Sequence, residues 1–257
     1  MPLMTYEEYR KVRHKTPYTY SINSGSNILY YFGERHSFNP DDVQWLEMKS
    51  YWQDFLEKSK CHKRIVFVEG GQRPSEDTQE QAIIKHGGMG LVTYLAKQEG
   101  VEIYSPEPNE KYERGELVKQ FSKEEIQYYY FARIVHQWGN KQEPKPDFTE
   151  YMSRYLESDK NTSGWANFDF SVNAMKKIHD KMFQTTFDEN NSDFFYSIID
   201  PAEPKTIINK VSAMSSDIRD RYIVGEIRKY ILNEYSVFVE YGCTHAVMQE
   251  PLLREVL

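Results

Sequence analysis

The chain has 257 residues, of which 39% are hydrophobic and 28% are charged, with a formal net charge of −7. The acidic balance excludes a general nucleic-acid binder, because neutralising phosphates requires a basic face. No apolar run approaches the roughly 20 residues that span a bilayer, and the first ten residues lack the apolar core of a secretory signal, so we expect neither a membrane protein nor a secreted one.

The first part of the chain alternates apolar runs of strand composition with helical patterns, which implies βαβ units and a mostly parallel sheet. The expected elements are a short helix at 5–14, a turn at 17–24, a strand at 27–32, a helix at 41–58, a strand at 64–68, a helical segment at 76–99 interrupted by glycines at 87–90, and a strand at 101–105. Asn39 is the expected N-cap of the second helix, followed by Pro40 at its first position. The strand at 64–68 is apolar on both faces, which indicates burial inside a covered sheet.

The pattern changes after residue 115. Residues 115–200 are helical, aromatic and polar, and we interpret them as a helical insertion or lid that caps the carboxyl edge of the sheet within one domain, 1–257. The rest of the chain is expected to hold a loop at 203–211, a helix at about 214–233, a strand at 236–241 and a short helix that starts at Glu250-Pro251. The sequence therefore predicts an α/β fold with a central, mostly parallel or mixed sheet flanked by helices.

Four apolar runs each end in polar groups next to glycine or proline. These groups are Glu34 with His36, Glu69, Glu107, and His245. The first and last runs both end in Gly-x-x-His. Because the carboxyl ends of parallel strands line the ligand crevice of an open sheet, we expect these side chains to meet there.

Two imidazoles and two carboxylates suit hydrolysis by either of two routes. With a divalent metal such as Mn, Zn or Co, His36, Glu69 and His245 would be ligands, and the metal would generate hydroxide. Without metal, one histidine would be the general base, a glutamate would orient it, and an arginine would stabilise the oxyanion. The spacing is not His-Glu-x-x-His, so the residues leave both routes open.

Two further segments carry candidate residues. Arg219 and Asp220 lie on the helix before the last strand, where they form either a solvated salt-bridged surface or part of the site. Cys243 lies inside the second Gly-x-x-His and is either a nucleophile beside His245 or a small buried residue. With Cys61 it makes only two cysteines, too few for a disulfide framework, which is typical of the reducing cytoplasm.

Four segments follow one another in an order that is similar to a known group of proteins. They are Gly33-Glu34-Arg35-His36, Val68-Glu69-Gly70, Ser216-Asp217-Ile218-Arg219-Asp220 and Tyr241-Gly242-Cys243-Thr244-His245. This pattern resembles the superfamily that groups erythromycin esterases, TraB/Tiki proteins and ChaN-like haem-binding proteins. Members of that group share an early Gly-x-x-His, a Glu at the end of a strand, a late Arg on a helix and a second Gly-x-x-His. The resemblance covers roughly 25–110 and 205–257.

The resemblance implies one site lined by His36, Glu69, Arg219 and His245, and both Glu34 and Asp220 also match it. Glu107 is added from topology alone. The group includes metal-dependent peptidases and metal-independent esterases, so the resemblance leaves the use of a metal open.

We therefore expect a cytoplasmic hydrolase that cleaves an ester or amide bond in a small-molecule or peptide substrate. In this reading His36 is a general base or ligand positioned by Glu34, and Glu69 is a second base or ligand. Arg219 stabilises developing negative charge, while His245 is a ligand or a second acid/base.

Two other functions fit the same residues. One is a non-catalytic protein that binds haem, a metal or a small anion in the same crevice. The other is an inactive scaffold that binds a protein partner through its helical insertion. Site variants that keep partner binding, together with loss of binding when about 141–200 is deleted, would indicate the scaffold.

Overall fold

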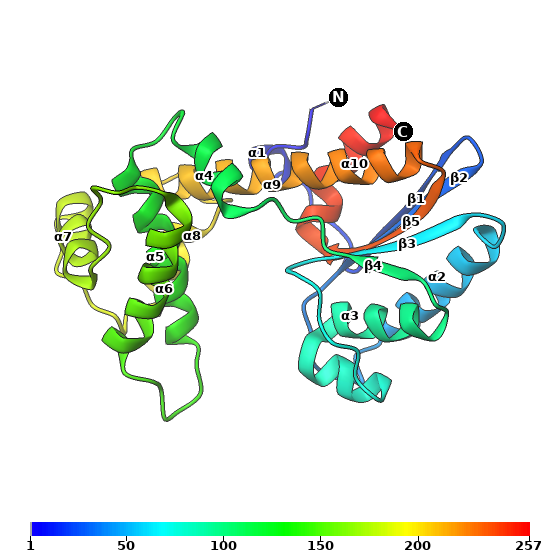
Figure 1. The fold of residues 1–257 in the computed structure, drawn as a ribbon, viewed down its shortest axis with the longest axis horizontal. Helices are drawn as coiled ribbons and strands as arrows, with labels where there is room; N and C mark the ends of the chain where they lie inside the picture. Colours follow the sequence, from blue (N-terminus) through cyan, green and yellow to red (C-terminus); the bar gives the residue numbers. More distant parts are fainter. Residues whose placement is uncertain (1) are drawn as a thin grey trace. The chain divides into compact units, whose positions relative to one another are not determined.

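The computed structural model describes residues 2–257 and divides the chain into two compact units (Figure 1). One unit holds the chain up to Glu107 together with Arg219–Leu257, and the other holds Pro108–Ile218. The first unit contains a five-stranded mixed sheet in the order β1-β2-β5-β3-β4. The α/β fold predicted from the sequence, with a mostly parallel sheet flanked by helices, is confirmed.

The sheet unit combines five strands with helices from both ends of the chain. The strands are β1 (Tyr18–Ser24), β2 (Asn27–Glu34), β3 (Lys63–Val68), β4 (Glu102–Tyr104) and β5 (Tyr235–Gly242). The helices are α1 (Tyr6–Tyr9), α2 (Gln44–Lys58), α3 (Gln79–Gln98), the later part of α9 (Ile207–Leu232) and α10 (Cys243–Val256). β1 runs antiparallel to β2, and the remaining pairs are parallel.

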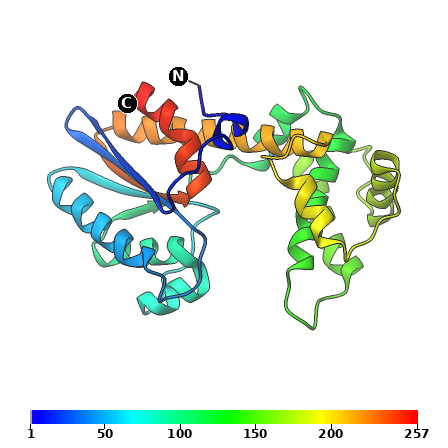
Figure 2. The same cartoon turned by 180° about the vertical axis from the view of Figure 1, so that it is seen from behind.

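Helices cover the sheet on both faces. Helices α2 and α3 pack on one face, and α9 and α10 pack on the other, as the two opposite views show (Figure 1, Figure 2). Side chains of β2 alternate between these layers, so that Tyr30 and Phe32 join the α2/α3 core while Leu29 and Tyr31 join the other core. This burial on both faces explains why the parallel strands read as continuous apolar runs.

Strand β5 lies between β2 and β3, although it comes last in the sequence. Glu240 is in register with Phe32 of β2 and with Val68 of β3. Because all three strands point the same way, their carboxyl ends meet at one edge of the sheet. The fold thus brings together segments from the two ends of the chain.

The second unit is entirely helical. It contains α4 (Glu110–Leu117), α5 (Lys123–Gly139), α6 (Phe148–Ser163), α7 (Val172–Phe183), α8 (Ser192–Ile199) and the beginning of α9. Its core is rich in aromatic side chains, including Tyr128, Phe131 and Phe195. The insertion expected at 115–200 lies inside this unit, which begins at Pro108 and ends at Ile218.

The turn expected at 17–24 is wrong, because these residues form the edge strand β1. Its residues pair with the whole of β2, from Tyr18 opposite Gly33 to Ser24 opposite Asn27. The serines and asparagine suggested a loop. Alternating Tyr and Ile side chains nevertheless bury one face against the core, and this tertiary packing overrides the local propensity.

Three helix boundaries also differ from expectation. The first helix has only four residues, Tyr6–Tyr9, instead of 5–14. Asn39 does not cap α2, whose N-cap is Val43; the Asn39 side chain instead accepts a hydrogen bond from the N–H of Asp41. Helix α9 begins at Ile207, within the loop expected at 203–211.

The C-terminal helix does not start at Glu250-Pro251. It begins at Cys243, directly after β5, and Pro251 lies inside it. The proline suggested a first helical position, but the chain turns into the helix at Gly242, where the strand ends. This turn places His245 in the first turn of α10.

The aromatic centre of the α2/α3 layer gives a test of this packing. Phe238 is fully buried on β5, with its ring centroid 5.2 Å from that of Trp52 and 5.5 Å from that of Phe55. We expect Phe238→Ala to lower the free energy of unfolding by about 3–5 kcal/mol, measured by urea unfolding. The control Leu46→Ala, on the exposed face of α2, should change it by less than about 0.5 kcal/mol. Equal effects of the two substitutions would contradict this core.

Candidate active site at the carboxyl edge of the sheet

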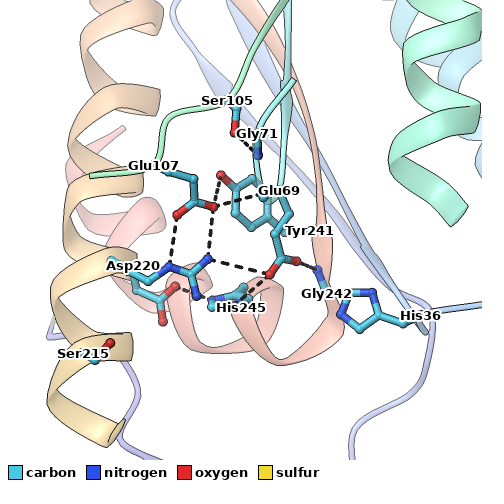
Figure 3. Close-up of polar contacts among 12 residues, drawn as sticks. His36, Glu69, Gly71, Ser105, Glu107, Ser215, Asp220, Tyr241, Gly242 and His245 are labelled. Carbon is cyan, nitrogen blue, oxygen red and sulfur yellow. Dashed lines mark hydrogen bonds and ion pairs between the residues drawn. The ribbon is translucent and has the colours of Figure 1, made fainter. Parts of the chain in front are cut away.

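The carboxyl edge of the sheet gathers most of the residues expected at the site (Figure 3). Glu34 and His36 come from the end of β2, Glu69 follows β3, and Glu107 follows β4. Arg219 and Asp220 come from α9, and His245 lies in the first turn of α10. Contacts among these side chains define two clusters. The first contains Glu69, His245, Asp220, Arg219 and Glu107, and the second is the pair Glu34 and His36.

Glu69 is central to the first cluster. Its Oε2 accepts a hydrogen bond of 2.8 Å from the N–H of Gly242, and its Oε1 lies 3.5 Å from Nε2 of His245 and 3.8 Å from Nη2 of Arg219. Burial alone would raise the pKa of Glu69, but the charge of His245, the Gly242 N–H and Arg219 together lower it. Glu69 is therefore an ionised carboxylate that links two cations.

His245 is held by a buried carboxylate on its other side. Its Nδ1 lies 2.6 Å from Oδ1 of Asp220, which is fully buried and also accepts a 2.7 Å hydrogen bond from Gln249. Burial alone would lower the pKa of His245. The charge and hydrogen bond of Asp220, with the charge of Glu69, outweigh burial and raise the pKa to about 9. The ring is thus an imidazolium at neutral pH, with Nδ1 bound to Asp220 and Nε2 facing Glu69.

His36 has a similar carboxylate partner but an exposed ring. Its Nδ1 lies 3.0 Å from Oε1 of buried Glu34, and 68% of its side chain is exposed. The Glu34 hydrogen bond raises the pKa of His36, and burial partly opposes this. A Cβ at Gly242 would lie 2.9 Å from Nε2 of His36 and 3.5 Å from Oε2 of Glu69. Glycine at 242 therefore allows the His36 ring to approach the Glu69 cluster.

Arg219 is fixed by Glu107. Nε and Nη2 of the guanidinium donate two hydrogen bonds of 3.0 Å to the two oxygens of Glu107, a bidentate pair. Glu107 also accepts hydrogen bonds from the N–H of Gly70, at 3.2 Å, and the hydroxyl of Tyr241, at 3.4 Å. Glu107, expected here from topology alone, is thus the main partner of Arg219.

Cys243 lies at the same edge, but its thiol faces a different segment. The sulfur is 3.4 Å from Oγ1 of Thr16 and 3.7 Å from the carbonyl oxygen of Lys15. Both partners belong to the segment before β1. These contacts give no support to a nucleophile that acts with His245.

A cavity of about 610 Å³ opens beside His36 and Glu69, a size typical of small-molecule sites. Its lining comprises Glu34, His36, Ser37, Phe38, Glu69, Gly70, Arg73, Lys85, His86, Gly87, Met89 and Glu240. Glu240 was not among the residues expected from the sequence. The signal was a single carboxylate within an otherwise apolar strand, which is unusual because an unpaired buried charge is costly.

The expected metal ligands do not fit a metal as they lie. Across residues 2–257, no group of three or more His, Cys, Asp or Glu side chains is arranged to hold a metal ion. In the set His36, Glu69 and His245, one oxygen of Glu69 is already bound by the Gly242 N–H, and the other faces an imidazolium and Arg219. A metal at Glu69 would have to replace these contacts, so we derive no step through one.

Comparisons with protein-family models, with curated proteins and with solved structures found no match. The superfamily resemblance therefore stays a hypothesis that rests on the four motifs. None of the helices between residues 2 and 257 is long and apolar enough to cross a bilayer.

The Asp220–His245 pair predicts a pH dependence of stability. Because the folded-state pKa of His245, about 9, exceeds its ordinary value of 6.5, the pair stabilises the fold fully below about pH 6.5. This contribution is lost as the pH rises through about 9. We expect Asp220→Asn to bring the pKa of His245 back toward 6.5, as measured by NMR titration of the ring. A wild-type pKa at or below 6.5 would contradict the assignment.

Proposed function

We propose that the protein is a hydrolase that cleaves an ester or amide bond, with His36 as the general base. One observation carries this proposal. His36 and His245 each have Nδ1 bound to a carboxylate, and both rings approach Glu69, but the His36 ring is much more exposed than the His245 ring. His245 lies against Asp220 and Glu69 with 13% of its side chain exposed, whereas 68% of the His36 side chain is exposed and can meet water. An exposed base beside a fixed cation suits acyl transfer to water.

The first step is activation of water by neutral His36. Glu34 accepts the Nδ1 hydrogen bond, which selects the tautomer whose Nε2 lone pair is free. Nε2 takes a proton from water as the water oxygen bonds to the carbonyl carbon of the substrate. The carbonyl π electrons move to oxygen, which becomes an oxyanion.

The two cations stabilise this oxyanion. Nε2 of His245, held as an imidazolium, lies 3.5 Å from Oε1 of Glu69, and Nη2 of Arg219, held by Glu107, lies 3.8 Å from the same oxygen. Their positions are fixed before the substrate binds, so little reorganisation is needed as charge develops. When the intermediate collapses, the bond to the leaving oxygen or nitrogen breaks and His36 returns its proton to the leaving group.

The cavity limits the substrate class. A volume of about 610 Å³ beside His36 suits a small molecule or the end of a peptide, and the lining mixes apolar Phe38 and Met89 with charged side chains. We therefore propose a small ester or amide that has both an apolar and a polar part.

Replacing either histidine by alanine tests the roles directly. We expect His36→Ala and His245→Ala each to reduce turnover of a chromogenic ester by about 100-fold or more, because loss of a general base or of a fixed cation typically has this effect. Turnover is measured on esters of graded chain length, and circular dichroism checks the fold.

His62→Ala is the matched control, because His62 precedes β3 at the opposite end of the strand. Its turnover should equal that of the wild type. Activity that survives both site substitutions would refute the assignment. Binding of a small anion or haemin that depends on both histidines, without any turnover, would favour the non-catalytic alternative.

Metal dependence is a separate prediction. His245 and Arg219 already face the oxygen of Glu69 that a metal would need. We therefore expect turnover to persist after exhaustive treatment with EDTA and to change less than about twofold on adding Mn²⁺, Zn²⁺ or Co²⁺. Elemental analysis of the purified protein accompanies the assay. Loss of activity with EDTA and its return with one of these ions would show that a metal belongs to the mechanism.

A further inference from the structure

A buried carboxylate on β5 has no role in the steps above. Glu240 is 1% exposed, and its Oε2 is buried without a hydrogen-bond partner. An uncompensated charge in such a place is strongly unfavourable, so a buried carboxyl group either loses its charge or has a partner. Burial, together with the charges of Glu34 and Glu69, raises the pKa of Glu240 well above its ordinary value.

Glu34 is the neighbour that faces Glu240. Residues 240 and 32 are in register on adjacent parallel strands, so residue 34, two positions further along, has its side chain on the same face. Oε2 of Glu34 is also buried and accepts no hydrogen bond from a side chain, while Oε1 of Glu34 is bound to Nδ1 of His36. Each carboxyl group thus has one buried oxygen without a side-chain partner on the face covered by α3.

Helix α3 is shaped to cover this pair. Its backbone leaves helical geometry at Gly87, with φ of 62° and ψ of −143°, a conformation that strongly favours glycine. At the next residue, a Cβ on Gly88 would lie 2.0 Å from Oε2 of Glu34 and 3.0 Å from Oε1 of Glu240. The carboxyl group of Glu34 therefore occupies the space that a side chain at 88 would need, and Oε1 of Glu240 borders the same space.

We propose that Glu240 is a positioning residue whose protonated carboxyl group donates a hydrogen bond to Oε2 of Glu34. Glu34 then has a partner for each oxygen: Glu240 for Oε2 and the His36 ring for Oε1. These hydrogen bonds form a chain from Glu240 on β5 through Glu34 on β2 to the exposed ring of His36. Its effect is to keep Glu34 ionised, in place, and bound to Nδ1, so that Nε2 of His36 stays free.

The effect on turnover rests on the proposed function, but the effect on the His36 ring does not. Glutamine at 240 keeps a donor of nearly the same shape and cannot ionise, whereas methionine keeps the volume and removes the donor. We expect Glu240→Gln to stay within about threefold of wild-type kcat and to preserve the ¹⁵N ring signals of His36. We expect Glu240→Met to lower kcat by about tenfold or more with little change in KM, and to reduce the Nδ1–H tautomer of His36.

Val239→Ala is the control, because Val239 is buried in the same strand on the opposite face. It should leave the His36 signals unchanged. Gly88→Ala is a second test of the same contacts. Its methyl group would displace Oε2 of Glu34, so it should change the ring signals of His36 as Glu240→Met does.

Two results would overturn the proposal. One is a Glu240→Met protein whose His36 tautomer and kcat match the wild type. The other is a Glu240→Gln protein as impaired as Glu240→Met. If Glu240→Met fails to fold, the ¹³C carboxyl signal of Glu240 in the wild-type protein tests the proposal instead. A signal typical of an ionised carboxylate at neutral pH would show that Glu240 cannot donate this hydrogen bond. If no substrate is found, the ring signals still test the chain of contacts independently.

Discussion

Parallel pairing of β5 between β2 and β3 is the constraint on which the site depends. It joins two segments from opposite ends of the chain and places their carboxyl ends at one edge. Glu34 is in register with Gly242, so the turn after β2 and the turn into α10 are neighbours. His36 and His245 follow these turns. Without this pairing, neither histidine would approach Glu69.

Charge pairing then fixes each group at that edge. Two cations, Arg219 and His245, are enclosed by carboxylates of Glu69, Glu107 and Asp220. These contacts hold Arg219 and His245 in place, whereas the ring of His36 remains exposed to solvent.

Local patterns in the sequence predicted much of the sheet and the identity of its strand-end residues. The apolar runs of β2, β3 and β5 are continuous because both of their faces are covered, and that signal is strong. β1 was missed because its polar alternate residues are typical of a loop, and only pairing with β2 makes it a strand. The helix start at Cys243 was missed because Pro251 is the stronger local signal.

The contacts within the site depend on tertiary structure that no local pattern contains. That Asp220 is the partner of His245, and Glu107 that of Arg219, follows from how α9 meets the strand ends. The sequence alone did not indicate Glu240, because its role depends on strand pairing that places it beside Glu34 and on the absence of a side chain at Gly88. A single carboxylate in a strand buried on both faces is the kind of signal that could have indicated it.

A double-mutant cycle between His36 and His245 tests the central claim, that both histidines act in one step on one substrate. Turnover is compared among the wild type, the two single alanine variants and the double variant. Residues that act as a unit give strongly non-additive losses, so we expect the double variant to be no more than about threefold slower than the worse single variant. Losses that multiply would show that the two histidines act independently, and would contradict a single site.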